Sequence, residues 1–598
     1  MAIVVLLGWF LVNRPGWSPD EEITVFAVRG ILSTGVPAMP SGWVYWRGAA
    51  YSYLSASAAA VAGDTLPTYR AIALAAAVAS VIGISVVAQR VVGYGAAAAL
   101  LLAIWPLTAS LSGYARFYAP FVAVYVGALL AFSQVERRRS ALWWFVIAAV
   151  VARALQEFAI SLLLIPLAAV LSAEIAEQRR RYLTCAVVAA ACVGGIHILL
   201  TLPQSPAGAA VSHWGFNRFA LPATTVSSLP ALTLVGPLDL MLLFALFTSV
   251  AIALHRTVGA DALFIVAAAG AAALFALGTI VAIVVTATLL RPARAARTAA
   301  ASLALLILAA VVWIAVISWR TDIAMSPAFA VDLLAASFRF PFSAARQLTL
   351  ALPVLAATTA GGVGWVMWSW RRPDGTTVVA RALACALWLH IIAVGIFEID
   401  LRVRHLAMLT PLIAVFAGIA LSTIVSSAFR AQRTIAGIAA LVLCGGVVAA
   451  MVVEQRRFAL DQIERAQQAW WGTWSPPIAQ STFDARQAPS LDAADIVISN
   501  DELASLLRIG RVDYWLAPAP AAELLTYETS DGAHRGAYGA AELISADALA
   551  SVIAARASHS VSLVVFHTGK FGIDEADSKT IAELTGGQRR ETVDWTHI

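Results

Sequence analysis

Residues 71–88 read AIALAAAVASVIGISVVA, a run of eighteen positions without a charged side chain. A run of this length can cross the hydrocarbon core of a bilayer as an α-helix. The whole chain has a matching composition, because 60% of its 598 residues are hydrophobic, only 13% are charged, and the mean hydropathy is +0.81. A soluble domain needs more polar surface, and the apolar runs lack the alternation of barrel strands. The sequence therefore predicts a polytopic α-helical membrane protein.

Further apolar runs predict about 13 transmembrane helices, within a range of about 11 to 15. The stretch 262–290 is open to two readings, one long tilted helix or a tight hairpin broken around Gly278, so the number of spans within 255–298 stays undetermined. The first run is read as a short retained span, because it has no basic leader and no small-residue cleavage site. The predicted spans lie near residues 1–13, 70–88, 96–111, 118–133, 141–155, 157–173, 182–201, 232–254, 299–318, 347–369, 378–396, 405–426 and 433–453.

Clusters of arginine predict the orientation, because basic loops stay in the cytoplasm. They place the N-terminus in the cytoplasm, and residues 14–69 and everything after Glu454 outside. The clusters are Arg137–Arg139, Arg179–Arg181, Arg291–Arg297, Arg371–Arg372 and Arg430–Arg433. The composition becomes polar after residue 455, so we expect a membrane domain over 1–455 and a small extracytoplasmic α/β domain over 456–598.

An acidic group opens the first predicted outer loop, in the order Trp17-Ser18-Pro19-Asp20-Glu21-Glu22. One interpretation is an ordinary helix start, with Ser18 as N-cap, Pro19 in the first turn and Glu21 completing a capping box. The other interpretation is catalytic, because a carboxylate just above the bilayer can accept a proton from a hydroxyl group. The residues alone leave both interpretations open.

The motifs around this group resemble those of a known family. Pro-Asp-Glu is followed by Gly-Val-Pro at 35–37, Pro-Ser-Gly at 40–42, Tyr-Trp-Arg-Gly at 45–48 and Tyr-Ala-Arg-Phe-Tyr at 114–118. This order resembles the GT-C glycosyltransferases, in particular the branch of protein O-mannosyltransferases and aminoarabinose transferases (glycosyltransferase family 39-like). The resemblance covers residues 10–455 and implies a cell-envelope enzyme in a bacterial or archaeal plasma membrane.

The resemblance implies a GT-C fold and transfer of a hexosyl or pentosyl group from a polyprenyl-phosphate donor, by one displacement with inversion. It implies that Asp20 is catalytic, with Glu21 beside it. Some family members carry a further acid near the start of the fourth span, where this chain has Arg116-Phe117-Tyr118. A second catalytic acid is therefore not identified. The acceptor, a glycan, lipid or protein, is not determined.

Several residues are predicted to bind the donor phosphate or the substrate: Tyr45, Arg47, Tyr114, Arg116, Tyr118, Glu157, Arg402, Arg404 and His405. A guanidinium group offers a planar fork of donors to phosphate oxygens. Each has a plainer alternative. Arg116 could snorkel to the interface, Arg47 could anchor an aromatic belt, Arg404 could pair with Glu398 or Asp400, and Glu157 could neutralise Arg153.

Neither metal nor nucleic acid is expected as a partner. No ligand spacing for a metal occurs, so no cofactor is required, although a divalent cation between Asp20 and a donor phosphate stays open. The net charge of +5 lies in short clusters between apolar runs and not on one soluble face. The alternative function is a transporter or flippase of lipid-linked or envelope precursors, which predicts internal repeats and charged, broken helices at mid-membrane.

Overall fold

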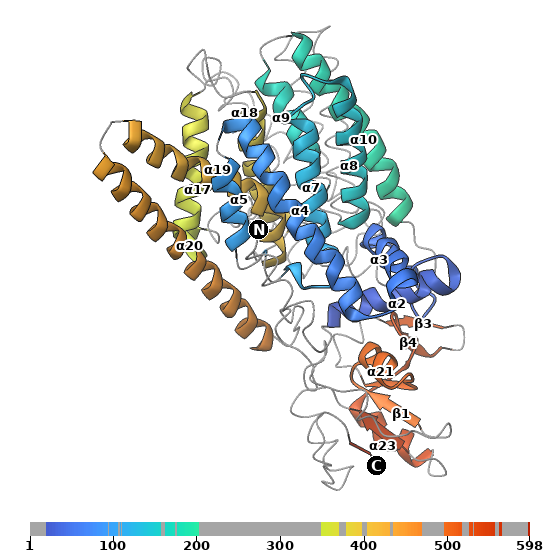
Figure 1. The fold of residues 1–598 in the computed structure, drawn as a ribbon. Coiled ribbons are helices and arrows are strands. Elements are labelled where there is room, and N and C mark those ends of the chain that lie inside the picture. The colour runs from blue at the N-terminus through green and yellow to red at the C-terminus, as the bar shows by residue number, and fades with distance from the viewer. Residues whose placement is uncertain are drawn as a thin grey trace, which may run out of the picture.

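The computed structural model of the chain describes residues 19–93, 95–105, 108, 111–156, 159, 162–173, 176–201, 349–369, 378–397, 403–430, 434–468, 496–516, 526–529, 532–555, 561–564 and 596–597. Long helices lie side by side through most of these ranges, and short strands occur near the C-terminal end (Figure 1). The helices α2 and α3 lie at the lower end of the bundle in this view, next to the strands.

The first described part of the chain is helical, and local sequence explains the bounds of its longest helix. The Thr65 hydroxyl accepts the Thr68 N–H at 3.4 Å, a proline follows in the first turn, and Gly93 ends the helix in a left-handed conformation. The helices are α2 (Pro19–Thr34), α3 (Ala49–Ala62), α4 (Leu66–Val92), α5 (Gly95–Ile104), α7 (Tyr118–Phe132), α8 (Arg139–Leu155), α9 (Leu164–Ser172) and α10 (Ala176–Thr201).

Four more helices follow: α17 (Pro353–Ser369), α18 (Val378–Phe397), α19 (Val403–Arg430) and α20 (Thr434–Gln468). The Glu454 carboxylate of α20 accepts the backbone N–H groups of Val354 and Leu355 at 2.9 and 3.2 Å. An acceptor at this position satisfies donors that the first turn of α17 leaves open. α20 runs on to Gln468, so this helix continues beyond residue 455, where the composition becomes polar.

Three of the described helices are long and apolar enough to cross a membrane, at Leu66–Val91, Leu409–Arg430 and Thr434–Arg457. Together with the composition, they make the chain an integral membrane protein. Described helices overlap the predicted spans between 70 and 201 and between 347 and 453. The predicted spans at 1–13, 232–254 and 299–318 and the stretch 255–298 lie outside the described residues. The total of about 13 spans therefore stays a prediction.

Two of the predicted cytoplasmic arginine clusters meet at one end of the bundle. Arg181 donates to the Glu136 carbonyl oxygen at 2.5 Å, and the Tyr182 hydroxyl donates to the Glu136 carboxylate at 2.5 Å. Glu136 directly precedes the cluster at 137–139, beyond the end of α7. The other end of α7 begins next to Arg116, which contacts α2. The clusters and the first loop thus lie at opposite ends of α7, whereas their sides of the membrane stay a prediction.

The described residues after 496 form a mixed sheet in the order β3-β4-β5-β2-β1-β6-β7. The central pairs, β5 with β2, β2 with β1 and β1 with β6, are parallel, and the outer pairs are antiparallel. All four residues of β1 are buried, as expected of a central parallel strand. The elements are β1 (Ile496–Ser499), α21 (Glu502–Arg508), β2 (Tyr514–Leu516), β3 (Thr526–Glu528), β4 (His534–Gly536), β5 (Glu542–Ile544), α23 (Ala546–Ala555), β6 (Val561–Val564) and β7 (Thr596–His597). We call residues 496–597 the C-terminal segment.

A small apolar core joins the C-terminal segment to the first loop. From the first loop it takes Ile23, Phe26, Ala27, Met39 and Tyr45, and from the C-terminal segment Leu503, Trp515, Tyr538 and Ala541. It is separate from the large core of the helix bundle. The first loop is therefore covered by residues some 500 positions later in the sequence.

Candidate functional site

The predicted catalytic aspartate lies in the first turn of a helix. α2 begins at Pro19, which agrees with the helix start that Ser18-Pro19 indicated, and Asp20 is its second residue. The side chain of Asp20 is outside what the structure describes. Its catalytic role stays a prediction, supported by the position of the backbone at the start of the first loop.

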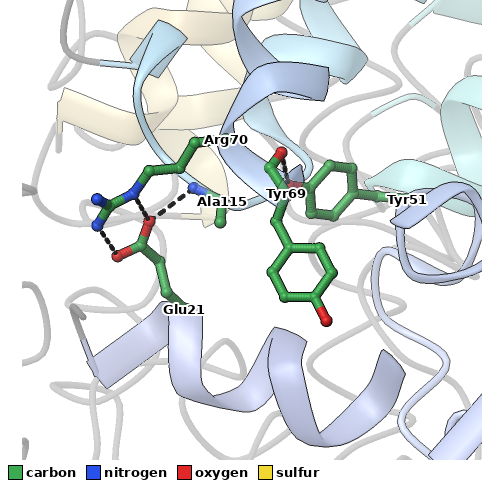
Figure 2. A network of polar contacts seen from close by, with 5 residues as sticks. All are labelled: Glu21, Tyr51, Tyr69, Arg70 and Ala115. Atoms are coloured by element: carbon green, nitrogen blue, oxygen red, sulfur yellow. Dashed lines mark hydrogen bonds and ion pairs between the residues drawn. The ribbon is translucent and has the colours of Figure 1, made fainter. Parts of the chain in front are cut away.

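Glu21, predicted beside it, is held in a buried ion pair that the sequence analysis did not foresee. Its carboxylate accepts from Arg70 Nε at 2.9 Å and Nη2 at 2.8 Å, and from the Ala115 N–H at 2.8 Å (Figure 2). Both charged side chains are 0% exposed. This bidentate contact connects α2, α4 and the turn before α7, because each residue comes from a different one of them. This geometry gives Glu21 a structural role, and its catalytic role stays a prediction.

Hydrogen bonds around α3 hold the same region in place. The buried Tyr51 hydroxyl donates to the Tyr69 carbonyl oxygen at 2.9 Å, just before Arg70 in the chain (Figure 2). Asp64, between α3 and α4, accepts from Arg29 Nε at 2.8 Å and from the Tyr69 hydroxyl. α2, α3 and the start of α4 therefore form one connected support for the first loop.

Arg116 is buried to 3% exposure among aromatic and hydroxyl groups. Its Nη1 donates to the Thr24 hydroxyl at 3.3 Å, and its Nη2 donates to the Tyr45 hydroxyl at 3.2 Å. The guanidinium carbon lies 5.0 Å from the Phe117 ring centroid and 5.8 Å from that of Tyr45. These contacts orient the guanidinium group.

A second arginine, Arg47 of the first loop, also approaches the Phe117 ring. The Arg47 guanidinium carbon lies 5.8 Å from the Phe117 centroid. The next residue, Gly48, has a φ of 71°, and a Cβ atom there would collide with the Phe117 side chain. Glycine is therefore required for the loop to bring Arg47 against Phe117. The structure thus brings together the Tyr-Trp-Arg-Gly and Tyr-Ala-Arg-Phe-Tyr motifs, which are about 70 residues apart.

The two tyrosines that flank Arg116 are also buried near it. Tyr114 and Tyr118 are stacked, with ring centroids 6.1 Å apart and planes at 3°. Phe117 packs on Tyr118 with centroids 4.7 Å apart. The predicted site residues Tyr45, Arg47, Tyr114, Arg116 and Tyr118 are therefore gathered by the first loop and the turn before α7.

The side chains of the other predicted residues lie outside what the structure describes. Arg404 and His405 lie in the first turn of α19, and their side chains are not described. Arg402 and Glu157 lie outside the described residues, while Arg153 is buried in the last turn of α8. Within the ranges that the structure describes, no group of three or more potential metal ligands is found. The roles of these residues and the expectation about metals remain predictions.

Sequence reasoning missed several residues that build this site. Arg70 is the fifth residue of the apolar helix α4, and its charge there was the available signal, because an arginine in a membrane span needs a partner. Thr24 lies one helical turn after Glu21 on α2, so both face the turn before α7. The residues of the C-terminal segment that pack on Tyr45 gave no local signal, because their contact depends on the chain returning from far away.

Comparison with known proteins gives a likeness of structure and none of sequence. No protein-family model matches the chain, and no curated protein sequence matches it. The archaeal oligosaccharyltransferase AglB from Archaeoglobus fulgidus, in complex with an inhibitory peptide and a dolichol-phosphate, superposes with a TM-score of 0.50 at 13% identity, covering 100% of this chain and 74% of that chain.

Two other structures are less similar. The apo form of the Archaeoglobus fulgidus oligosaccharyltransferase has a TM-score of 0.47 at 13% identity, covering 85% of this chain, which spans 63% of its length. ArnT from Cupriavidus metallidurans, bound to undecaprenyl phosphate, has a TM-score of 0.31 at 14% identity and covers 71% of this chain and 78% of that chain. The chain therefore has the fold of the archaeal oligosaccharyltransferase AglB, the GT-C fold that its first-loop motifs predicted.

Proposed function

We propose that this chain is a membrane glycosyltransferase that takes a sugar from a polyprenyl-phosphate donor and transfers it to an acceptor on the extracytoplasmic face. The observation that carries the proposal is the approach of Arg47 and Arg116 to one ring, Phe117, at 5.8 and 5.0 Å. A guanidinium group suits a phosphate group, which offers several oxygens and carries negative charge, and two such groups lie against the same ring. The shared fold with AglB, which was solved with a dolichol-phosphate, supports the same class of ligand.

In the proposed reaction, the oxygen of the acceptor hydroxyl attacks the anomeric carbon of the donor sugar, and Asp20 accepts the proton of that hydroxyl. The bond from that carbon to the phosphate oxygen breaks in the same step, so the configuration inverts. Arg116 and Arg47 stabilise the polyprenyl phosphate that departs, because positive charge close to a leaving group lowers the barrier. The donor sugar is a hexose or a pentose, and the acceptor is a glycan, lipid or protein.

The buried groups around the site suit this mechanism. Arg116 is oriented by the Thr24 and Tyr45 hydroxyls. The Glu21–Arg70 ion pair connects α2, which carries Asp20, to the turn that carries Arg116. Asp20 and Arg116 therefore lie on two segments, α2 and the turn before α7, that the buried Glu21 carboxylate connects. No cofactor enters the proposal, and transfer that continues in excess EDTA would agree with that.

The test is transfer by the purified chain in lipid nanodiscs with radiolabelled polyprenyl-phosphate sugars. We expect sugar release to water or transfer to an envelope extract. Asp20→Asn should reduce the rate by about 10²–10⁴-fold while lipid-phosphate binding persists. Glu22→Gln, the neighbouring acid on the same turn, is the comparison variant. Full activity in Asp20→Asn would remove the proposed base, and movement of a lipid-linked precursor across vesicles without transfer would favour the transporter alternative.

A further inference from the structure

The tip of the first loop is fastened to the C-terminal segment by two hydrogen bonds. The chain from 36 to 45 folds back on itself, with the Met39 N–H donating to the Trp43 carbonyl oxygen and the Tyr45 N–H donating to that of Pro37, both at 2.8 Å. At the tip, the Ser41 hydroxyl donates to the Ala537 carbonyl oxygen at 2.5 Å, and the Ser41 N–H donates to that of Tyr538 at 3.1 Å. Two contacts at one residue fix both the position and the direction of the tip.

A row of aromatic rings continues from this tip toward the candidate phosphate site. Tyr538 meets Trp43 edge to face, with centroids 5.2 Å apart and planes at 66°. Trp43 meets Tyr45 in the same manner, at 5.2 Å and 87°. The Tyr45 hydroxyl then accepts from Arg116 Nη2 at 3.2 Å. Two ring contacts and one hydrogen bond therefore connect the C-terminal segment to Arg116.

The position of Tyr538 is itself fixed by α21. The Tyr538 N–H donates to the Glu502 carboxylate at 3.2 Å, and this carboxylate lies against Gly536 and Gly539 so closely that a Cβ atom at either would collide with it. Glu502 and Tyr45 are only 3% and 5% exposed. The turn from 536 to 541 is thus tightly wrapped around one buried side chain, and it presents the Tyr538 ring rigidly to the first loop.

We propose that Tyr538 is a positioning residue for the donor phosphate. It holds Trp43 and Tyr45 so that the Arg116 guanidinium group keeps the direction in which it meets the phosphate. This inference rests on the proposed function. It assigns the C-terminal segment to donor binding. Tyr538 itself does not touch the substrate.

The test is the dissociation constant of radiolabelled polyprenyl phosphate, measured with the purified full-length chain in nanodiscs. Tyr538→Ala should raise the Kd roughly tenfold, because an edge-to-face ring contact and its packing are lost. Tyr538→Phe keeps the ring and should stay within about twofold. Tyr527→Ala removes a tyrosine from the edge strand β3 of the same sheet and should leave the Kd unchanged.

A double-mutant cycle shows whether the effect passes through the aromatic row. Trp43→Ala should also raise the Kd, and adding Tyr538→Ala to it should cause little further change, because the two residues act through one contact. Additive effects would overturn the route through Trp43. In transfer assays the KM for the donor should rise, whereas the KM for the acceptor should stay the same.

The outcomes separate this inference from the proposed function. If the wild-type chain binds and transfers but Tyr538→Ala binds polyprenyl phosphate equally well, the positioning role is wrong and the function stands. If the wild-type chain binds no polyprenyl phosphate, both are wrong. Should Tyr538→Ala fail to fold, Trp43→Leu breaks the same contact from the side of the first loop, and a normal Kd in that variant would contradict the inference.

Discussion

The first loop and the C-terminal segment each bury a carboxylate, and they stabilise it by different means. In the first loop, Glu21 faces the Arg70 guanidinium group, with both side chains fully buried. In the C-terminal segment, Glu502 is 3% exposed and accepts backbone N–H groups, including that of Tyr538. Burial raises the pKa of Glu502 from 4.5 to about 7, and the backbone N–H groups of Gly539 and Tyr538 lower it by less. The countercharge of Arg70 thus makes the Glu21–Arg70 pair an ionic joint, a buried ion pair that connects two helices. Glu502 has no such role and instead titrates near neutrality.

The largest expected effect comes from breaking the ionic joint. Arg70→Met leaves Glu21 buried without its guanidinium partner, and we expect unfolding to become easier by about 3–5 kcal/mol. Thermal unfolding of the protein in detergent would measure this. Replacing both residues, as Glu21→Leu with Arg70→Met, should recover most of the loss, because apolar residues can replace a buried ion pair. If the single and double variants were equally unstable, the pair would have a role beyond neutralising each other's buried charge.

The second prediction concerns the pH dependence of the C-terminal segment. Because the folded segment holds the Glu502 proton up to a pKa of about 7 and the unfolded chain releases it near 4.5, its stability is full below pH 4.5 and falls as the pH rises toward 7. The fall should be roughly 3 kcal/mol. Limited proteolysis of the segment between pH 4.5 and 8 would follow it.

The matched variant for this pH dependence is Glu502→Gln, which is neutral at every pH. Its C-terminal segment should show a nearly flat proteolysis profile over the same range. A wild-type segment that becomes more stable as the pH rises would contradict the direction of the shift and would place a countercharge near Glu502.

A smaller effect is expected from crowding the Glu502 carboxylate without changing its charge. Gly536→Ala puts a Cβ atom into the space that the carboxylate occupies. The turn must then shift, at a cost of about 1–3 kcal/mol. Gly532→Ala is a control of a different kind, since Gly532 has open space but a φ of 81°, so only backbone strain is added. Equal tolerance of both variants would show that the turn is loosely held.

The smallest effect should follow loss of an exposed ion pair. Arg29 and Asp64 form a contact at 2.8 Å like that of Glu21 and Arg70, but their side chains are 45% and 33% exposed. Water and salt screen such a pair, so Arg29→Gln should change stability by less than about 1 kcal/mol. The unfolding midpoint in low and high salt measures it. A loss as large as that of Arg70→Met would mean that burial does not decide the difference.

Most of the helical architecture could be predicted from hydrophobicity alone. α4, α7 and α18 overlap the predicted spans at 70–88, 118–133 and 378–396, because a long run with at most one charged residue has no stable alternative to the helix in hydrocarbon. α9 is shorter than predicted, at nine residues, and α20 longer, at 35 residues. The contact of Glu454 with the start of α17 is likewise one that no local pattern indicates.

The candidate site was predictable in some of its members and not in their arrangement. Tyr45, Arg47 and Arg116 were marked by motifs, and the structure gathers them around Phe117. The partner of Glu21 was not predictable, because a carboxylate in a first helical turn suits a capping box as well as a distant arginine. Only the folded chain, which brings Arg70 of α4 to Glu21 of α2, decided between these two partners.

By itself, the sequence determined that this chain is a membrane protein, roughly where most described helices of the bundle lie, and which charged and aromatic residues lie near their ends. These properties follow from the free-energy cost of placing charges or backbone groups without hydrogen bonds in hydrocarbon. Each segment avoids this cost through its own sequence and its own helical hydrogen bonds. The tertiary structure alone decided that Glu21 pairs with Arg70 and that Tyr538 reaches the first loop through Trp43. Such contacts join residues 49 and 495 positions apart, and their energy depends on a direction and a distance that only the folded chain defines.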